Sequence, residues 1–171
     1  MNNLPLEDSR YLDAAEGWLG LGDLLAARAE LDEIAADWRG HPDVLAVRYR
    51  IFEKERRWEN CLELATTIVQ LAPESSFGWI HRSFALHELK RTQEAVDELL
   101  PAVTIFPNDI TIRYNLACYE CVLGNLPLAK LRLTETLVMA EKLKRFDECR
   151  AEMLEDPDLK PLWQIIKQAR C

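Results

Sequence analysis

The chain has 171 residues, a formal net charge of −8 at pH 7 and an apolar fraction of 49%. This composition is typical of a soluble globular protein, and the acidic balance argues against nucleic acid or an anionic membrane as the main ligand. The longest apolar stretch, LLPAVTIF, is too short to span a bilayer, and the start MNNLPLEDSR does not resemble a signal peptide. We therefore expect a cytoplasmic protein.

Apolar residues recur at steps of three and four along almost the whole chain, and no stretch sustains an alternation of period two. This pattern predicts an all-α protein. Pro101 falls inside one predicted helix and should kink it, because proline removes a backbone hydrogen bond. Asn125 is the predicted N-cap of another, with Pro127 in its first turn. In chain order, the predicted helices cover 8–20, 24–38, 43–55, 58–72, 76–89, 92–105, 110–123 and 126–143.

The sequence also repeats itself with a period of 34 residues. A small residue on a helix lets a neighbouring helix approach, and residues four and seven positions later lie on the same face. The period therefore predicts antiparallel helix pairs that bury their apolar faces by stacking on the next pair. The positions that share it are Ala27, Cys61, Ala95 and Ala129, then Leu31, Ala65, Leu99 and Leu133, then Ile34, Ile68, Ala102 and Thr136.

The pattern resembles that of tetratricopeptide repeat (TPR) proteins of the small bacterial type. In the unit 76–109, Trp79 stands at the family's tryptophan position and Pro107 at its closing proline. The first unit departs from the pattern, since Arg39 stands where proline is expected. The resemblance implies an α-solenoid formed by a single domain, 1–171. Its predicted parts are the repeats 8–41, 42–75, 76–109 and 110–143 and a C-terminal cap, 144–171.

The tail DECRAEMLEDPDLKPLWQIIKQARC carries two short helical patterns around EDPDL. A repeat array needs an end cap, because its last helix pair would otherwise expose its core. We expect a capping helix here. The alternative is a detachable tail that occupies the groove or binds a partner.

Cys118 and Cys121 form a Cys-x-x-Cys motif, which can mark a redox couple or half of a zinc site. Redox pairs normally begin at a helix N-terminus, whereas these two lie well inside a predicted helix. A structural zinc site needs four ligands, and the sequence shows no second pair. With five scattered cysteines in all, we expect reduced thiols and a packing role.

In TPR proteins, the second, fifth, ninth and twelfth positions of each unit face a concave groove that usually binds an extended peptide or a helix. The resemblance places corresponding residues of this chain there. They are Ser9, Leu12, Glu16 and Leu19 in the first unit, Asp43, Ala46, Arg50 and Glu53 in the second, Phe77, Ile80, Phe84 and His87 in the third, and Thr111, Tyr114, Cys118 and Cys121 in the fourth.

Phe77, Ile80 and Phe84 form an apolar stripe apart from the core face of the same helix. A partner protein, self-association or internal burial by the C-terminal helix would each explain this second face. Asn115 and His81 occupy the family's sixth position and are expected to bond a peptide backbone, while Arg50 could select an acidic flank. The full set of predicted partner-binding residues is Arg50, Phe77, Ile80, His81, Phe84, His87, Tyr114, Asn115 and Cys118.

The sequence has no glycine-rich phosphate loop, nucleophile elbow or His-Glu-x-x-His motif, so we expect neither an enzyme nor a cofactor or metal. The predicted function is a non-catalytic adaptor or scaffold that binds a protein or peptide in the groove. Two alternatives remain open. One is a secretion-type chaperone that masks an apolar client segment, and the other is a structural homodimer whose groove is self-buried.

Overall fold

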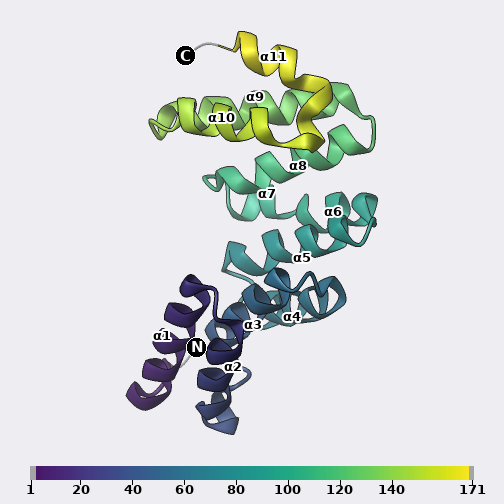
Figure 1. Ribbon diagram of the computed structural model, residues 1–171. Coiled ribbons are helices and arrows are strands. Elements are labelled where there is room, and N and C mark those ends of the chain that lie inside the picture. The colour runs from purple at the N-terminus through teal and green to yellow at the C-terminus, as the bar shows by residue number, and fades with distance from the viewer. Residues whose placement is uncertain (1–2, 170–171) are drawn as a thin grey trace. The chain divides into compact units, whose positions relative to one another are not determined.

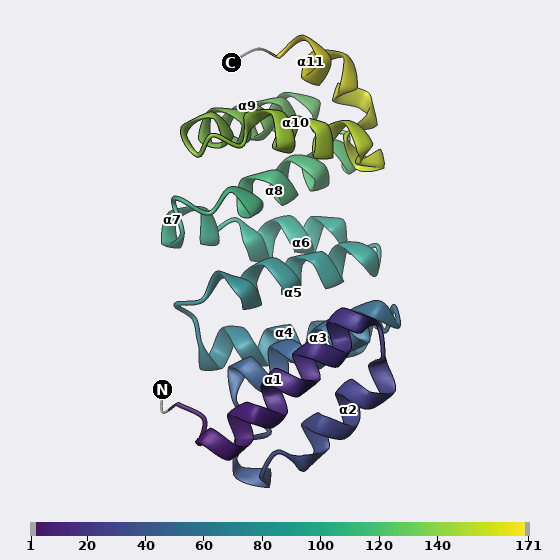
Figure 2. The ribbon, with the colours of Figure 1, turned by 60° about the vertical axis from the view of Figure 1, so that its left-hand side comes forward.

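The computed structural model describes residues 3–169, which form helices joined by short turns and contain no strand. The chain divides into two compact units, unit 1 up to Ala85 and unit 2 from Leu86. The helices are labelled in Figure 1 and seen from a second direction in Figure 2. An all-α fold was predicted from the apolar period, and it is confirmed.

Unit 1 consists of two helix pairs and most of a fifth helix. The helix α1 (Leu6–Leu21) pairs with α2 (Leu24–Glu33), and α3 (Pro42–Lys54) pairs with α4 (Trp58–Leu71). The short 3₁₀ helix η1 (Ala36–Trp38) joins the pairs, and α5 (Ser76–Glu88) continues from unit 1 into unit 2. The helix α3 packs against both α1 and α2, so the second pair stacks on the first.

Unit 2 continues with α6 (Thr92–Leu99), α7 (Ala102–Ile105), α8 (Ile110–Val122) and α9 (Leu126–Lys142). It ends with α10 (Phe146–Glu155), the 3₁₀ helix η2 (Pro157–Leu162) and α11 (Trp163–Gln168). The closest pair is α8 with α9, while α10 packs on α9 and η2 lies on α8. Pro101 separates α6 from α7, which confirms the predicted interruption of that helix.

The 34-residue period corresponds to the buried face of each second helix. Every small residue of the period is fully buried, and so are the residues four and seven positions later. The same period governs the turn within each pair, where Gly22, Arg56, Lys90 and Gly124 all have positive φ. Two glycines and two basic residues therefore adopt the same left-handed conformation. This conformation costs more free energy for the basic residues than for glycine, because they have a Cβ atom.

The second helix of the first repeat is shorter than predicted. It was expected to reach residue 38, but α2 ends at Glu33, and Ile34 is extended. The carboxylate of Asp8 accepts a 2.7 Å hydrogen bond from the backbone N–H of Ala35, which fixes the chain in this bend. The guanidinium of Arg39 donates to the carbonyls of Ile34 (2.8 Å) and Asp32 (2.6 Å). Arg39 thus satisfies carbonyls at the end of α2 at the position where the family pattern has proline.

Asn125 occupies the N-cap position of α9, as predicted, but its side chain has a different partner from the one usual at an N-cap. Asn125 does precede α9, and Pro127 does lie in its first turn, but the Asn125 side chain makes no capping hydrogen bond. Its Nδ2 donates instead to Glu120 Oε2, at 2.8 Å. The Asn125 amide therefore attaches the turn before α9 to Glu120, near the end of α8.

The C-terminal segment packs on α8 and α9 within unit 2. Met153, Leu159 and Ile166 are fully buried, with Leu162 almost so. Burying each such side chain contributes roughly 1.5–3 kcal/mol. Detaching the segment would expose all of them together, which is a large fraction of the stability of a small domain. The capping alternative is therefore favoured over a detachable tail.

Candidate functional site

Unit 1 contains an open hollow of about 530 Å³. Its walls come from α1, α3 and the first turn of α5, and the end of α4 closes one side. The residues that occupy the predicted groove positions and line it are Leu12, Glu16, Asp43, Ala46, Arg50 and Phe77. Three successive repeats thus contribute the equivalent face of their first helices to one hollow.

The start of α3 shapes one wall of this hollow. Pro42 occupies the first turn of α3, where its missing N–H costs nothing, and the Nδ1 atom of His41 accepts a 3.3 Å hydrogen bond from the backbone N–H of Asp43. Ala46 follows one turn later and leaves open space because its side chain is a single methyl group. The hollow therefore depends on a small residue between two polar positions of α3.

Arg50 connects two sides of the hollow. Its Nη1 lies 3.1 Å from Glu16 Oε1 on α1, and its guanidinium carbon lies 5.7 Å from the centre of the Phe77 ring on α5. Both charged side chains are almost half exposed. The ion pair therefore contributes only about 0.2–1 kcal/mol, and its main effect is to orient the guanidinium.

An aromatic cluster of Tyr49, Phe77 and His81 supports the Phe77 side of the hollow. The rings of Phe77 and His81 stack at 3.8 Å, and Tyr49 meets both rings edge-on. The Tyr49 hydroxyl donates to the His81 carbonyl at 3.1 Å, and His81 Nδ1 lies 2.9 Å from the Phe77 carbonyl. Because a carbonyl only accepts, Nδ1 carries a proton. Burial lowers the pKa of His81, which favours the neutral ring.

The predicted apolar stripe does not act as one surface. Phe77 lines the hollow, whereas neither Ile80 nor Phe84 is among the described residues around it. Phe84 packs edge-on against Trp58 of α4, with 5.6 Å between the ring centres. Ile80 is half-buried. Part of the stripe is therefore covered within unit 1 by the neighbouring helix.

In unit 2, the C-terminal segment covers three of the predicted groove residues. The Tyr114 hydroxyl donates to Asp156 Oδ2 at 2.7 Å, and the Cys118 thiol donates to the same oxygen at 3.4 Å. His87 Nε2 lies 3.0 Å from Asp158 Oδ2, and the other ring nitrogen lies 3.1 Å from the Thr92 hydroxyl. His87 and Cys118 are buried. These three side chains thus hold the chain's own carboxylates.

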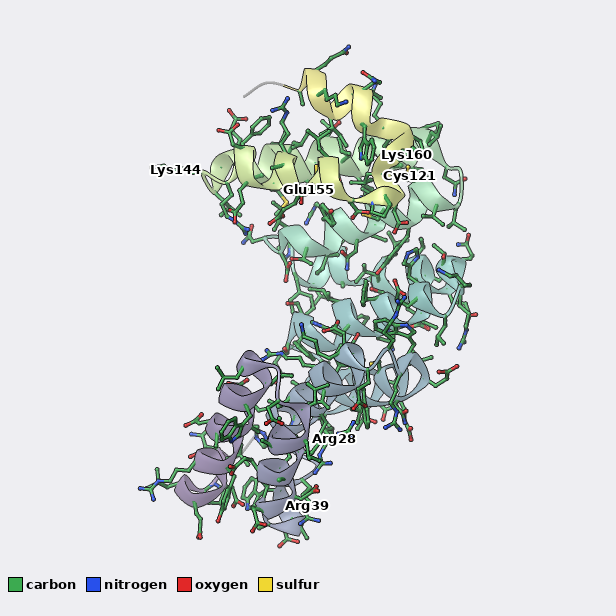
Figure 3. The ribbon with its side chains drawn as sticks, in the orientation of Figure 1. Arg28, Arg39, Cys121, Lys144, Glu155 and Lys160 are labelled. Carbon is green, nitrogen blue, oxygen red and sulfur yellow. The ribbon has the colours of Figure 1, made fainter. Side chains whose placement is uncertain are left out.

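The contact of η2 with α8 also covers Cys121. Figure 3 labels Cys121 on α8 and Lys160 on η2, the two elements in contact. Burial raises the pKa of both Cys118 and Cys121, and the nearby Asp156 and Asp158 act in the same direction. A redox couple needs a lowered thiol pKa, so the environment of the Cys-x-x-Cys motif favours packing over redox chemistry.

Asn115 of α8 belongs to unit 2. It lines a smaller pocket of about 290 Å³ in unit 2, between the first half of α8 and the helix α10. Tyr114 and Cys149 lie in the same pocket, with Arg145 and Glu152 at its charged side. The two predicted backbone-bonding residues, Asn115 and His81, therefore belong to different compact units.

No group of three or more histidine, cysteine or acidic side chains suited to a metal ion occurs among residues 3–169. In the same part of the chain, no helix has both the length and the apolar character to cross a membrane. The described cysteines, Cys61, Cys118, Cys121 and Cys149, are all free and buried. Cys171, the fifth in the sequence, lies outside the described residues.

No family model matches the sequence, and no curated protein matches it. Among solved structures, TTC0263, a thermophilic TPR protein of Thermus thermophilus, is similar over 95% of this chain and 100% of its own, with a TM-score of 0.68 and 19% identity. The chain has the tetratricopeptide repeat fold.

Two further structures have this TPR fold in common with the chain. The MamA RS-1 ArsTM double mutant matches 80% of this chain and 77% of its own, with a TM-score of 0.70 and 14% identity. The Cut9-Hcn1 hetero-tetramer structure of the APC/C matches 94% of this chain, with a TM-score of 0.70 and 16% identity. The chain spans only 30% of the latter's length. At these identities the comparisons establish the TPR fold alone.

Two residues of the site in unit 2 were missed by the sequence analysis. Asp156 and Asp158 were assigned only to the ending of the tail, yet their carboxylates contact predicted groove residues. Asp156 meets Tyr114 of the fourth repeat, and Asp158 meets His87 of the third. Both aspartates lie outside the 34-residue period, so the repeat pattern gives them no position. In unit 1, by contrast, the TPR register alone named six residues around the hollow.

Proposed function

We propose that this protein is a non-catalytic interaction module that binds an extended peptide segment of a partner protein in the hollow of unit 1. The observation that carries the proposal is the convergence of groove positions from three successive repeats on one open hollow of about 530 Å³. A space of this size suits a few residues of an extended chain better than a whole helix, since a helix with its side chains is about 10–12 Å wide.

The lining of the hollow supports the same proposal. Leu12, Ala46 and Phe77 supply an apolar surface for side chains, while Glu16, Asp43 and Arg50 supply polar groups at the edge. A peptide site needs both, because apolar burial supplies affinity and a few placed polar groups fix register. The aromatic cluster behind Phe77 holds that wall in one conformation, which lowers the entropic cost of binding.

Unit 2 plays a different part in this proposal. Asp156 of the chain itself contacts Tyr114 and Cys118 of the fourth repeat, and Asp158 contacts His87 of the third. A ligand at these positions would have to displace the buried C-terminal segment. We therefore keep Arg50 and Phe77 as ligand-contacting residues and His81 as a supporting residue. Tyr114, Cys118 and His87 are assigned to the attachment of the C-terminal segment.

The test is selection of a random twelve-residue peptide library on the purified full-length protein, with Ala46→Trp as the groove-blocking variant. Ala29→Trp is the matched control, because Ala29 is an exposed residue of α2 outside the hollow. We expect peptides that bind the wild type and Ala29→Trp, but bind Ala46→Trp at least about tenfold more weakly. Circular dichroism and sedimentation must show that all three are folded and have the same mass.

Peptides that bind all three proteins equally would place the ligand elsewhere and contradict the proposal. Failure to select any peptide would do the same. A mass of two chains for the wild type and one chain for Ala46→Trp would support the rival explanation, a homodimer that buries its own groove.

A further inference from the structure

The charges around the hollow indicate which class of peptide it takes. We propose that the ligand carries a lysine or arginine whose aliphatic stem lies on the apolar floor and whose charged end meets the carboxylates at the rim. This inference rests on the function proposed above and adds the sign of the ligand's charge.

Most of the charged side chains that line the hollow are acidic. Glu16, Asp43 and Glu74 are acidic, and Arg50 is the one guanidinium among the described residues around it. The three carboxylates come from α1, α3 and the turn after α4, so they approach the space from different sides. The hollow therefore has an excess of negative charge, which attracts ligands of positive charge.

Arg50 was predicted from the sequence to bind an acidic flank of the ligand. The guanidinium already pairs with Glu16 at 3.1 Å and lies over the Phe77 ring. An acidic ligand would have to take Arg50 from Glu16 and would meet Asp43 and Glu74 with like charge. A cationic ligand needs no such rearrangement.

The two remaining carboxylates, of Asp43 and Glu74, are accessible to a ligand. The Asp43 carboxylate is 71% exposed, and its Oδ2 lies 3.6 Å from Nδ1 of His41. That nitrogen accepts a hydrogen bond from the Asp43 backbone N–H, so it carries no proton to donate to the carboxylate. Glu74 is exposed and has no cationic partner in the part of the chain that the structure describes. Both can therefore accept hydrogen bonds from an ammonium or guanidinium group of a ligand.

A long basic side chain also suits the apolar part of the hollow. Lysine and arginine lay their methylene stems along apolar surface while the charged end stays at the water boundary. Leu12, Ala46 and Phe77 form such a surface, and Asp43 and Glu74 lie at its edge. An uncharged apolar side chain would fill the floor but leave both carboxylates unused.

The test uses the peptides that the library selection yields on the full-length wild-type protein. We expect lysine or arginine to be enriched at one position among the peptides lost with Ala46→Trp. Synthetic peptides with that residue, with norleucine and with glutamate in its place are then titrated. The basic peptide should bind about tenfold more tightly than the norleucine peptide, with the glutamate peptide weakest.

The protein-side variant is Asp43→Asn/Glu74→Gln, which keeps the shape of both side chains. It should weaken binding of the basic peptide about tenfold and leave the norleucine peptide unchanged. The matched control is Glu98→Gln, an exposed carboxylate of α6 outside the hollow, which should change neither.

The outcomes separate this inference from the proposed function. Peptides that need the open groove but are enriched in acidic residues, or show no charge preference, overturn the charge inference and leave the groove as the site. Equal loss of the basic and norleucine peptides in Asp43→Asn/Glu74→Gln also overturns it. Absence of any groove-dependent peptide overturns the proposed function and this inference together.

Discussion

The hydroxyl of Tyr114 donates a 2.7 Å hydrogen bond to Asp156 Oδ2, joining residues 42 positions apart in the sequence. Through it, α8 holds the residue that joins α10 to η2 within the C-terminal segment. Asp156 in turn accepts a hydrogen bond from the Asp158 backbone N–H at 2.9 Å, so one carboxylate both shapes the turn and attaches it.

Tyr114→Phe is therefore expected to destabilise the protein by about 1.5–3 kcal/mol, since the lost hydrogen bond has a carboxylate acceptor and is partly buried. Urea denaturation followed by circular dichroism measures this change. The matched control is Tyr11→Phe, in unit 1, whose hydroxyl has no hydrogen-bond partner among the described residues. A double-mutant cycle with Asp156→Ala should show coupling, and additive effects would contradict the assignment.

Gly78 of α5 lies in close contact with α4. A methyl group added at Gly78 would lie 2.9 Å from both Val69 Cγ2 and Val69 N of α4. We expect Gly78→Ala to cost about 1–3 kcal/mol of unfolding free energy by overpacking, despite the better helix propensity of alanine. Gly17→Ala is the control, because Gly17 also lies in a helix but has nothing within 4 Å of the added methyl.

The two substitutions should change the urea midpoint in opposite directions. Gly17→Ala is expected to stabilise by up to about 1 kcal/mol. The double variant Gly78→Ala/Val69→Ala should recover only part of the loss, because the backbone nitrogen of residue 69 stays in place. A neutral or stabilising Gly78→Ala would show that α4 and α5 do not approach as closely as described.

At the turns within the helix pairs, replacing a residue by glycine is expected to stabilise the protein. Arg56 (φ 57°) and Lys90 (φ 65°) have the left-handed conformation that Gly22 and Gly124 have at equivalent positions. Arg56→Gly and Lys90→Gly should each stabilise by about 0.5–1 kcal/mol, since relief of a cost of about 1–2 kcal/mol exceeds the extra freedom of glycine in the unfolded chain. Thermal unfolding of each variant measures this gain.

The reverse substitution, Gly124→Lys, is the matched control and should destabilise by a similar amount. Loss of stability in Arg56→Gly would instead assign a specific stabilising contact to the arginine. Arg56 and Lys90 lie in different units, so the two results are independent of each other.

The buried thiols predict how stability depends on pH. Burial raises the pKa of Cys61 from its ordinary value of 9.0 to about 12, and it also raises the pKa values of Cys118, Cys121 and Cys149. The unfolded chain therefore releases these protons first. Below about pH 9 the thiols are protonated in both the folded and the unfolded chain, so their full contribution to folding stability is present. Between about pH 9 and 12 the unfolded chain ionises first, and the free energy of unfolding should fall in this range.

Urea titrations at intervals from about pH 8 to pH 11 would measure the slope, and Cys118→Ala/Cys121→Ala should reduce it. Thiol reactivity gives an independent measurement. In a Cys171→Ser background, a thiol reagent near pH 8 should react slowly with the native protein and fully after unfolding. Rapid reaction of Cys118 or Cys121 in the native protein would contradict the burial of the pair beneath η2.

The sequence by itself determined the helices, their pairing and the buried faces. Ala27, Cys61, Ala95 and Ala129 could be assigned to helix contacts because every repeat solves the same packing problem with the same spacing. The register also named the lining of the hollow in unit 1, since repeated helices present the same positions to the same side.

The tertiary structure decided what lies outside the period. Asp156 and Asp158 meet Tyr114, Cys118 and His87 only because the C-terminal segment turns back onto α8, and a short turn carries no periodic signal. The pairing of Arg50 with Glu16 likewise depends on the distance between α1 and α3. Local spacing fixes which residues share a helix face, but side chains from distant segments meet only where packing brings them together.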